Sequence, residues 1–168
     1  VTINSAWGPI TVVNVVGRVF MPPNDCPFRA MDAFITGRAG QGGIILVDVH
    51  AEATSEKIVL GRYLDGRVTC VAGTHTHVQT SDETILPKGT AYITDLGMTG
   101  PKDSAIGRDL GSITARFLTG MPEPFKVATN DIVLEGLILE VQRDGGRVTG
   151  VERIRLRTGV TGGDDTGN

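Results

Sequence analysis

The stretch Val71-Ala72-Gly73-Thr74-His75-Thr76-His77-Val78 decides how the rest of the chain is interpreted. The apolar run 68–72 leads into it and is typical of a short buried strand, which ends at a glycine. Two imidazoles then follow, one residue apart. In extended backbone the side chains of residues i and i+2 leave the same face, so we expect both rings to reach one small volume at the end of the strand.

The third histidine of the sequence, His50, ends a second apolar run over 44–49. If the two strands are neighbours in a sheet, their ends lie roughly 5 to 10 Å apart, and the three rings can converge. A single histidine is more often an ordinary hydrogen-bonded residue, but neutral imidazole is also the commonest side-chain metal ligand. The sequence therefore predicts a metal site formed by His50, His75 and His77, either mononuclear or part of a larger centre.

Composition limits the classes of protein to which the chain can belong. Its 168 residues fit one domain with a core of its own. The net charge of −3, without a basic stripe, argues against a nucleic-acid polymer as the main partner. No apolar run approaches the ~18 residues that cross a bilayer, so we expect no membrane association. The two distant cysteines, Cys26 and Cys70, favour a cytoplasmic, reduced protein.

Apolar periodicity outside these stretches predicts a mixture of strands and helices. Residues 2–6 and 10–16 form a predicted hairpin whose second strand is covered on both faces, and residues 132–141 and 148–156 form another. Helices are predicted over 28–38, 54–64 and 113–118, and a further strand over 90–94. Thr54 or Ser55 is the predicted N-cap residue of the second helix. The glycine-rich segment 95–101 is either a plain turn or a binder of anions through its N–H groups.

These elements include one strand–helix–strand crossover, from Ile44 to Ala72, in which the two strands run parallel. Together with the hairpins, the crossover predicts a two-sheet α/β sandwich. We expect one domain over residues 1–157 and a flexible tail over residues 158–168, which is rich in glycine, threonine and aspartate.

Three stretches, Val47–Lys57, Gly73–Glu83 and Gly89–Pro101, closely resemble the bacterial calcineurin-like metallophosphoesterases that act as 2′,3′-cyclic-nucleotide 2′-phosphodiesterases. The likeness runs from Asn14 to about Leu156. It implies a four-layer α/β/β/α sandwich with two metal ions, iron or manganese. His50 and His75 would bind one ion and His77 the other. The implied substrate is a small phosphodiester, attacked in line by a metal-bridging hydroxide.

The chain departs from this family pattern ahead of Val1. There the family carries an aspartate, a bridging glutamate next to an asparagine, and an Asn-His pair whose histidine protonates the leaving oxygen. We therefore expect the chain to supply metal ligands but no proton donor, and to be active only if the missing ligands are supplied. Alone, it is expected to bind at most one metal weakly. An unpaired sheet edge and exposed apolar surface would favour homo-oligomers or poor solubility.

Two alternatives remain open on the sequence. The chain is either a non-catalytic metal-binding or structural member of the same fold, or a mononuclear three-histidine hydrolase. Three acidic residues, Asp48, Glu52 and Glu83, either orient the histidines or are ordinary solvated carboxylates.

Overall fold

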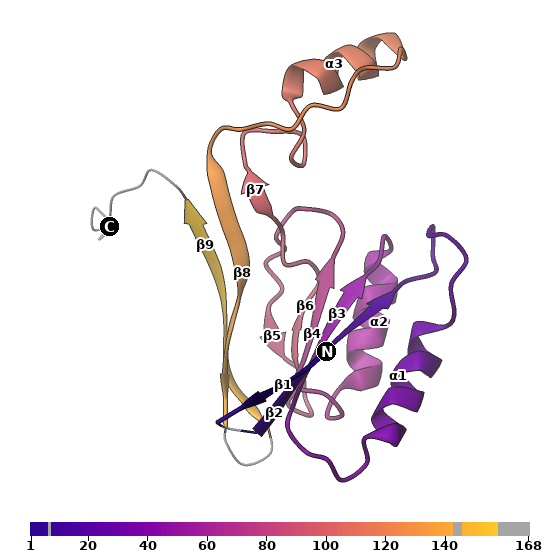
Figure 1. Ribbon diagram of the computed structural model, residues 1–168, viewed down its shortest axis with the longest axis vertical. Helices are drawn as coiled ribbons and strands as arrows, with labels where there is room; N and C mark the ends of the chain where they lie inside the picture. The colour runs from indigo at the N-terminus through magenta and orange to yellow at the C-terminus, as the bar shows by residue number, and fades with distance from the viewer. Residues whose placement is uncertain (7, 143–145, 158–168) are drawn as a thin grey trace.

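Six strands form the larger sheet of the computed structural model, which describes residues 1–6, 8–142 and 146–157 (Figure 1). The strands lie in the order β1-β2-β3-β4-β6-β5. The inner strands β2, β3, β4 and β6 are parallel, and the edge strands β1 and β5 pair antiparallel with their neighbours. The bounds are β1 Thr2–Ser5, β2 Gly8–Val16, β3 Ile44–His50, β4 Cys70–Thr74, β5 Thr84–Ile85 and β6 Ala91–Ile93.

The predicted N-terminal hairpin is confirmed, since β1 pairs with β2 from Thr2↔Thr11 to Ser5↔Gly8. Gly8 has a φ of 105°, which only glycine adopts readily. The prediction that β2 is covered on both faces is wrong, because Val12 is 40% exposed. This residue lines an apolar cavity of about 220 Å³ between the two sheets, which do not close fully at this edge.

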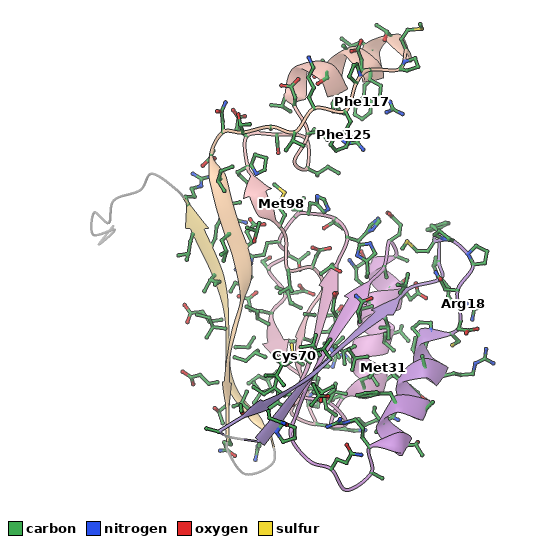
Figure 2. The ribbon with its side chains drawn as sticks, in the orientation of Figure 1. Arg18, Met31, Cys70, Met98, Phe117 and Phe125 are labelled. Carbon is green, nitrogen blue, oxygen red and sulfur yellow. The ribbon has the colours of Figure 1, made fainter. Side chains whose placement is uncertain are left out.

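The predicted crossover is also confirmed. β3 and β4 are parallel, and the helix between them, α2 (Thr54–Leu64), lies with α1 (Pro27–Gly37) on one face of the sheet (Figure 1). The predicted strand over 68–72 occupies 70–74 instead, because Gly73 and Thr74 continue the ladder opposite Val49 and His50. Met31 lies in the core between the helices and the sheet (Figure 2).

The cap predicted for α2 is wrong. Ala53 is the N-cap residue, and neither Thr54 nor Ser55 caps the helix with its side chain. Glu56, in the first turn, instead accepts hydrogen bonds from the N–H groups of Arg18 and Val19. Its carboxylate thus fixes the start of the proline-containing loop that follows β2.

The smaller sheet packs on the other face of the larger one and has the order β7-β8-β9 (Figure 1). Its strands are β7 Thr99–Pro101, β8 Ile132–Val141 and β9 Val148–Arg157. The predicted hairpin of β8 and β9 is confirmed, with Leu139 paired to Val151. The core between the sheets includes Cys70, Ala91 and Val148 (Figure 2).

The remaining helix, α3 (Leu110–Thr119), belongs to a segment between β7 and β8, residues 102–131, which we call the arm. The arm projects beyond both sheets (Figure 1), and α3 has no buried residue. Phe117 and Phe125 lie on this arm (Figure 2) and are 81% and 64% exposed.

The described residues therefore form an α/β protein with a helix layer and two sheets, and no helix among them covers the outer face of the smaller sheet. Nor does any described helix combine the length and the apolar character that crossing a membrane requires. The tail predicted for residues 158–168 lies outside the described residues, so the domain limit at residue 157 stays a prediction.

Candidate metal centre

The structure brings two of the three predicted ligands into contact at the C-terminal ends of β3 and β4. His50 is the last residue of β3, and His75 follows β4 directly. Nε2 of His50 lies 3.1 Å from Nδ1 of His75. The ring centroids are 4.9 Å apart, at an interplanar angle of 74°. The predicted convergence is confirmed for this pair.

A chain of hydrogen bonds fixes the tautomer of His50. Asn14 donates from Nδ2 to Asp48, and the hydroxyl of Thr74 donates to the other oxygen of this carboxylate, at 2.9 Å. Because the single hydroxyl proton of Thr74 is used in this way, its oxygen can only accept from Nδ1 of His50, at 3.1 Å. In the neutral ring, Nε2 of His50 then carries a lone pair that points toward His75.

His75 is fixed in the opposite tautomer by a carboxylate. Its Nε2 lies 2.6 Å from Oε2 of Glu52, which as an ionised carboxylate can only accept. Nε2 therefore carries a proton. In their neutral forms, which metal ligation requires, the two rings face each other with the lone pairs of Nε2 of His50 and Nδ1 of His75.

This arrangement fits a cation between the two rings. Ligand nitrogens lie about 2.0–2.1 Å from a zinc-like ion, so two neighbouring ligands of one ion are about 3 Å apart. The 3.1 Å separation agrees with that spacing. Partners that hold each ring in its tautomer, here Thr74 and Glu52, are what metal-ligating histidines usually have.

His77 makes contacts that differ from those of His50 and His75. Its Nδ1 donates to the carbonyl oxygen of Ile106 at 2.9 Å, which leaves Nε2 with a lone pair. Ile106 belongs to the arm and has a φ of 49°, an unusual value for a β-branched residue. Among the described residues, no group of three or more His, Cys, Asp and Glu side chains is placed to hold a metal ion.

The backbone reason given for the convergence of His75 and His77 is wrong. β4 ends at Thr74, and the two histidines have φ values of 124° and 60° rather than extended backbone. They occupy a tight loop in which the i, i+2 alternation of a strand does not apply.

The acidic residues proposed to orient the histidines divide into two groups. Glu52 contacts His75 directly, and Asp48 acts on His50 through Thr74. Glu83 is not at the site, because it pairs with Arg153 at 2.6 Å. The glycine-rich segment also has no free N–H groups at Gly97 and Met98, which bond to Asp95 and Glu135.

Sequence reasoning missed Thr74 and the role of Asn14. Both follow from the parallel register, in which Asn14 lies opposite Asp48 and His50 lies opposite Thr74. The sequence does show polar residues within otherwise apolar strands. Which of these residues contact one another becomes clear only from the pairing of the strands.

A family model described as YmdB-like protein matches residues 1–154. The chain belongs to the YmdB-like family. A relative from Bacillus subtilis (strain 168), named 2′,3′-cyclic-nucleotide 2′-phosphodiesterase, is 49% identical over 147 residues, which are 88% of this chain and 56% of the relative. This YmdB-like chain thus spans little more than half the length of that curated relative.

Two solved structures are similar to this YmdB-like chain. One is a hypothetical protein from Thermus thermophilus, with a TM-score of 0.86 and 44% identity, covering 93% of this chain and 60% of that one. The other is a novel phosphatase from Mycoplasma pneumoniae, with a TM-score of 0.84 and 35% identity, covering 94% and 56%. The YmdB-like fold described above is therefore shared with proteins of known structure.

Proposed function

We propose that this chain contributes metal ligands to a metal-dependent phosphodiesterase that hydrolyses 2′,3′-cyclic nucleotides. The observation that carries the proposal is the 3.1 Å approach of Nε2 of His50 to Nδ1 of His75, with the rings held by Thr74 and Glu52. The name of the B. subtilis relative supports the reaction, and the name of the M. pneumoniae structure supports phosphate ester chemistry.

In this proposal His50 and His75 hold one ion and His77 holds a second, iron or manganese. When bound, the ions supply Lewis acidity toward the phosphate. The residues of this chain do the positioning: Asp48, through Thr74, and Glu52 hold the rings of His50 and His75 in place. Since the described residues contain no group of three converging ligands, we propose that further ligands complete the centre.

The same proposal includes the four-layer sandwich, of which the helix layer and both sheets support three layers. It also includes self-association of the chain and a reducing, cytoplasmic location. The free thiols of Cys26 and Cys70 support the location. The substrate is a small phosphodiester rather than a nucleic-acid polymer.

Hydrolysis of a 2′,3′-cyclic nucleotide in the presence of added Mn²⁺ tests the proposal. The chain alone, and the chain within a protein of the relatives' full length, are assayed with His75→Ala and, as a control away from the site, Asp32→Asn. Asp32 pairs with Arg67 on the surface. We expect the longer protein to be active. His75→Ala should abolish this activity, and Asp32→Asn should leave it unchanged. Activity that His75→Ala leaves unchanged contradicts the metal mechanism.

Metal stoichiometry separates the alternatives. Two ions per chain in the longer protein support the binuclear centre, one ion supports a mononuclear three-histidine hydrolase, and no ion supports a structural role. The separate contacts of His77 favour the binuclear arrangement, because a mononuclear site needs all three rings around one point.

A further inference from the structure

A buried ion pair contacts the backbone around the loop of residues 75–77, which we call the histidine loop, and has no part in the chemistry described above. Nζ of Lys57 is 3.2 Å from Oδ2 of Asp95, and both residues are 0% exposed. Lys57 occupies the buried stripe of α2 that also contains Leu60 and Leu64, where an apolar residue is expected. Burying two charges is costly, and a hydrophobic pair of similar volume often stabilises a fold as well or better. Packing alone therefore does not explain the pair.

The other contacts of the pair are with the backbone of the residues before and after His75. Nζ of Lys57 donates to the carbonyl oxygen of Thr74 at 3.3 Å, and Oδ2 of Asp95 accepts from the N–H of Thr76 at 2.9 Å. The peptide groups on both sides of the histidine are thus held by one ion pair. The second oxygen of Asp95 accepts from the N–H of Gly97 at 3.0 Å, which ties the carboxylate itself to its own loop.

His75 needs such support because its backbone is unusual. Its φ of 124° lies in a region that residues with a side chain rarely adopt. Conformations of this kind persist only where the surroundings impose them. Without fixed positions for the Thr74 carbonyl and the Thr76 N–H, this residue can relax, and its ring then leaves the position 3.1 Å from His50.

Gly73 makes room for the same arrangement. A Cβ atom at this position would overlap the carbonyl oxygen of Thr94 and lie 2.7 Å from Cδ of Lys57. The glycine before the histidine loop therefore lets the lysine stem reach across β4 to Asp95.

We propose that Lys57 and Asp95 form a positioning pair that holds the backbone of His75, and through it the ring, in the geometry for binding a metal ion. This inference rests on the proposed function, since it concerns the same site. The pair acts through His75 and contacts no substrate.

The first half of the test is a calorimetric titration with Mn²⁺ of the chain within a protein of the relatives' full length. We expect Asp95→Asn and Lys57→Met each to weaken Mn²⁺ binding by about 10- to 100-fold, the usual effect of removing an outer contact of a metal ligand. Lys57→Arg, which keeps the charge, is expected to restore part of the affinity. Unchanged affinity in a folded Asp95→Asn variant overturns the proposal.

The matched control is Asp65→Asn. Asp65 is also a buried carboxylate, 7% exposed, that accepts from two backbone N–H groups, those of Lys88 and Thr90, but at the N-terminal ends of the strands. We expect this variant to lose thermal stability and to bind Mn²⁺ as the unaltered chain does. If Asp65→Asn loses as much Mn²⁺ affinity as Asp95→Asn, lower stability of the fold accounts for both losses, and the proposal is overturned.

The second half of the test uses the metal-free chain, so that it does not depend on the proposed function. Long-range ¹⁵N–¹H spectra report the tautomer of His75, and hydrogen exchange reports the N–H of Thr76. We expect the Nε2–H tautomer and a protected N–H in the unaltered chain, and mixed tautomers with faster exchange in Asp95→Asn. If the unaltered protein of the relatives' full length binds no Mn²⁺, the proposed function fails, while these spectra still decide the positioning role. Identical spectra in both proteins overturn it.

Discussion

The hydroxyl of Thr74 is the link between a ligand histidine and its carboxylate. Replacing it, in Thr74→Val, removes the acceptor for Nδ1 of His50 and one donor to Asp48 while keeping the shape of the side chain. We expect Mn²⁺ affinity to fall about 10- to 100-fold in a calorimetric titration. Thr11→Val is the control, since Thr11 is a buried strand threonine bonded to Thr2. An equal fall of Mn²⁺ affinity in both variants would show that loss of any strand hydroxyl weakens binding, and would contradict a specific role of Thr74.

The two thiols should differ in reactivity. Burial raises the pKa of Cys70 to about 12, whereas hydrogen bonds, the largest from the backbone of Arg29, lower the pKa of Cys26. Thiolate is the reactive form, so iodoacetamide at about pH 8 should modify Cys26 and leave Cys70 intact in the folded chain. Intact-mass and peptide analysis measures the adducts. Equal labelling of both thiols without denaturant would contradict the buried position of Cys70.

At the scale of elements, two helical glycines should differ in how their replacement by alanine changes the stability of the fold. A Cβ at Gly61 in α2 would lie 2.5 Å from Cδ2 of Tyr92 in β6, whereas a Cβ at Gly37 in α1 meets nothing within 4 Å. We expect Gly61→Ala to destabilise the fold by ~1–3 kcal/mol through overpacking. Gly37→Ala should be neutral or stabilising by up to ~1 kcal/mol. Urea unfolding of both variants measures the difference.

The ionised carboxylate of Asp82 ties the segment before β5 to Thr94, which follows β6. Burial alone would raise the pKa of Asp82, but hydrogen bonds from Thr80 and Thr94 outweigh it and lower this pKa. Because the unfolded chain then binds the proton more readily, Asp82 stabilises the fold above its unfolded pKa of about 3.9. The contribution is lost as the pH falls through the lower pKa of the folded state.

Thermal unfolding across the pH range tests this linkage. The melting temperature of the unaltered chain should exceed that of Asp82→Asn at neutral pH, and the gap should close as the pH drops below about 4. A gap that stays constant down to this pH would mean that ionisation of the carboxylate is not what stabilises the segment.

Sequence could predict elements whose signals are local. β3 has the predicted limits because an apolar run ends at His50, and α1 begins and ends within one residue of the predicted helix. The contacts of Glu56 and the role of Lys57 were not predictable, because each depends on contacts between segments far apart in the chain. For the same reason the sequence grouped the three histidines but did not predict the contacts with Thr74 and Glu52 that hold His50 and His75 as a pair.

At the scale of the whole molecule, the arm presents several exposed apolar side chains. α3 has one charged side chain, Arg116, and no buried residue, while Phe117 and Leu118 are each 81% exposed. A nearly uncharged apolar surface offers little to a charged polymer but matches a second copy of itself. We therefore propose that copies of the chain associate through their arms.

Size-exclusion chromatography with light scattering tests this association. We expect Phe117→Ser combined with Leu118→Ser to shift the chain toward the monomer. Ile3→Thr, on the open edge strand β1 and 58% exposed, should have little effect. A monodisperse monomer of the unaltered chain would contradict association, and a shift caused by Ile3→Thr alone would move the contact to the sheet edge.

The parallel pairing of β3 with β4 also bears on the order in which the site forms. Parallel neighbours meet only after the intervening helix has crossed over and docked, so His50 and His75 cannot approach each other through local chain closure. A cation therefore meets the His50–His75 pair only in a polypeptide that has completed the crossover. Capture of an ion by this pair follows folding of the crossover and does not initiate it.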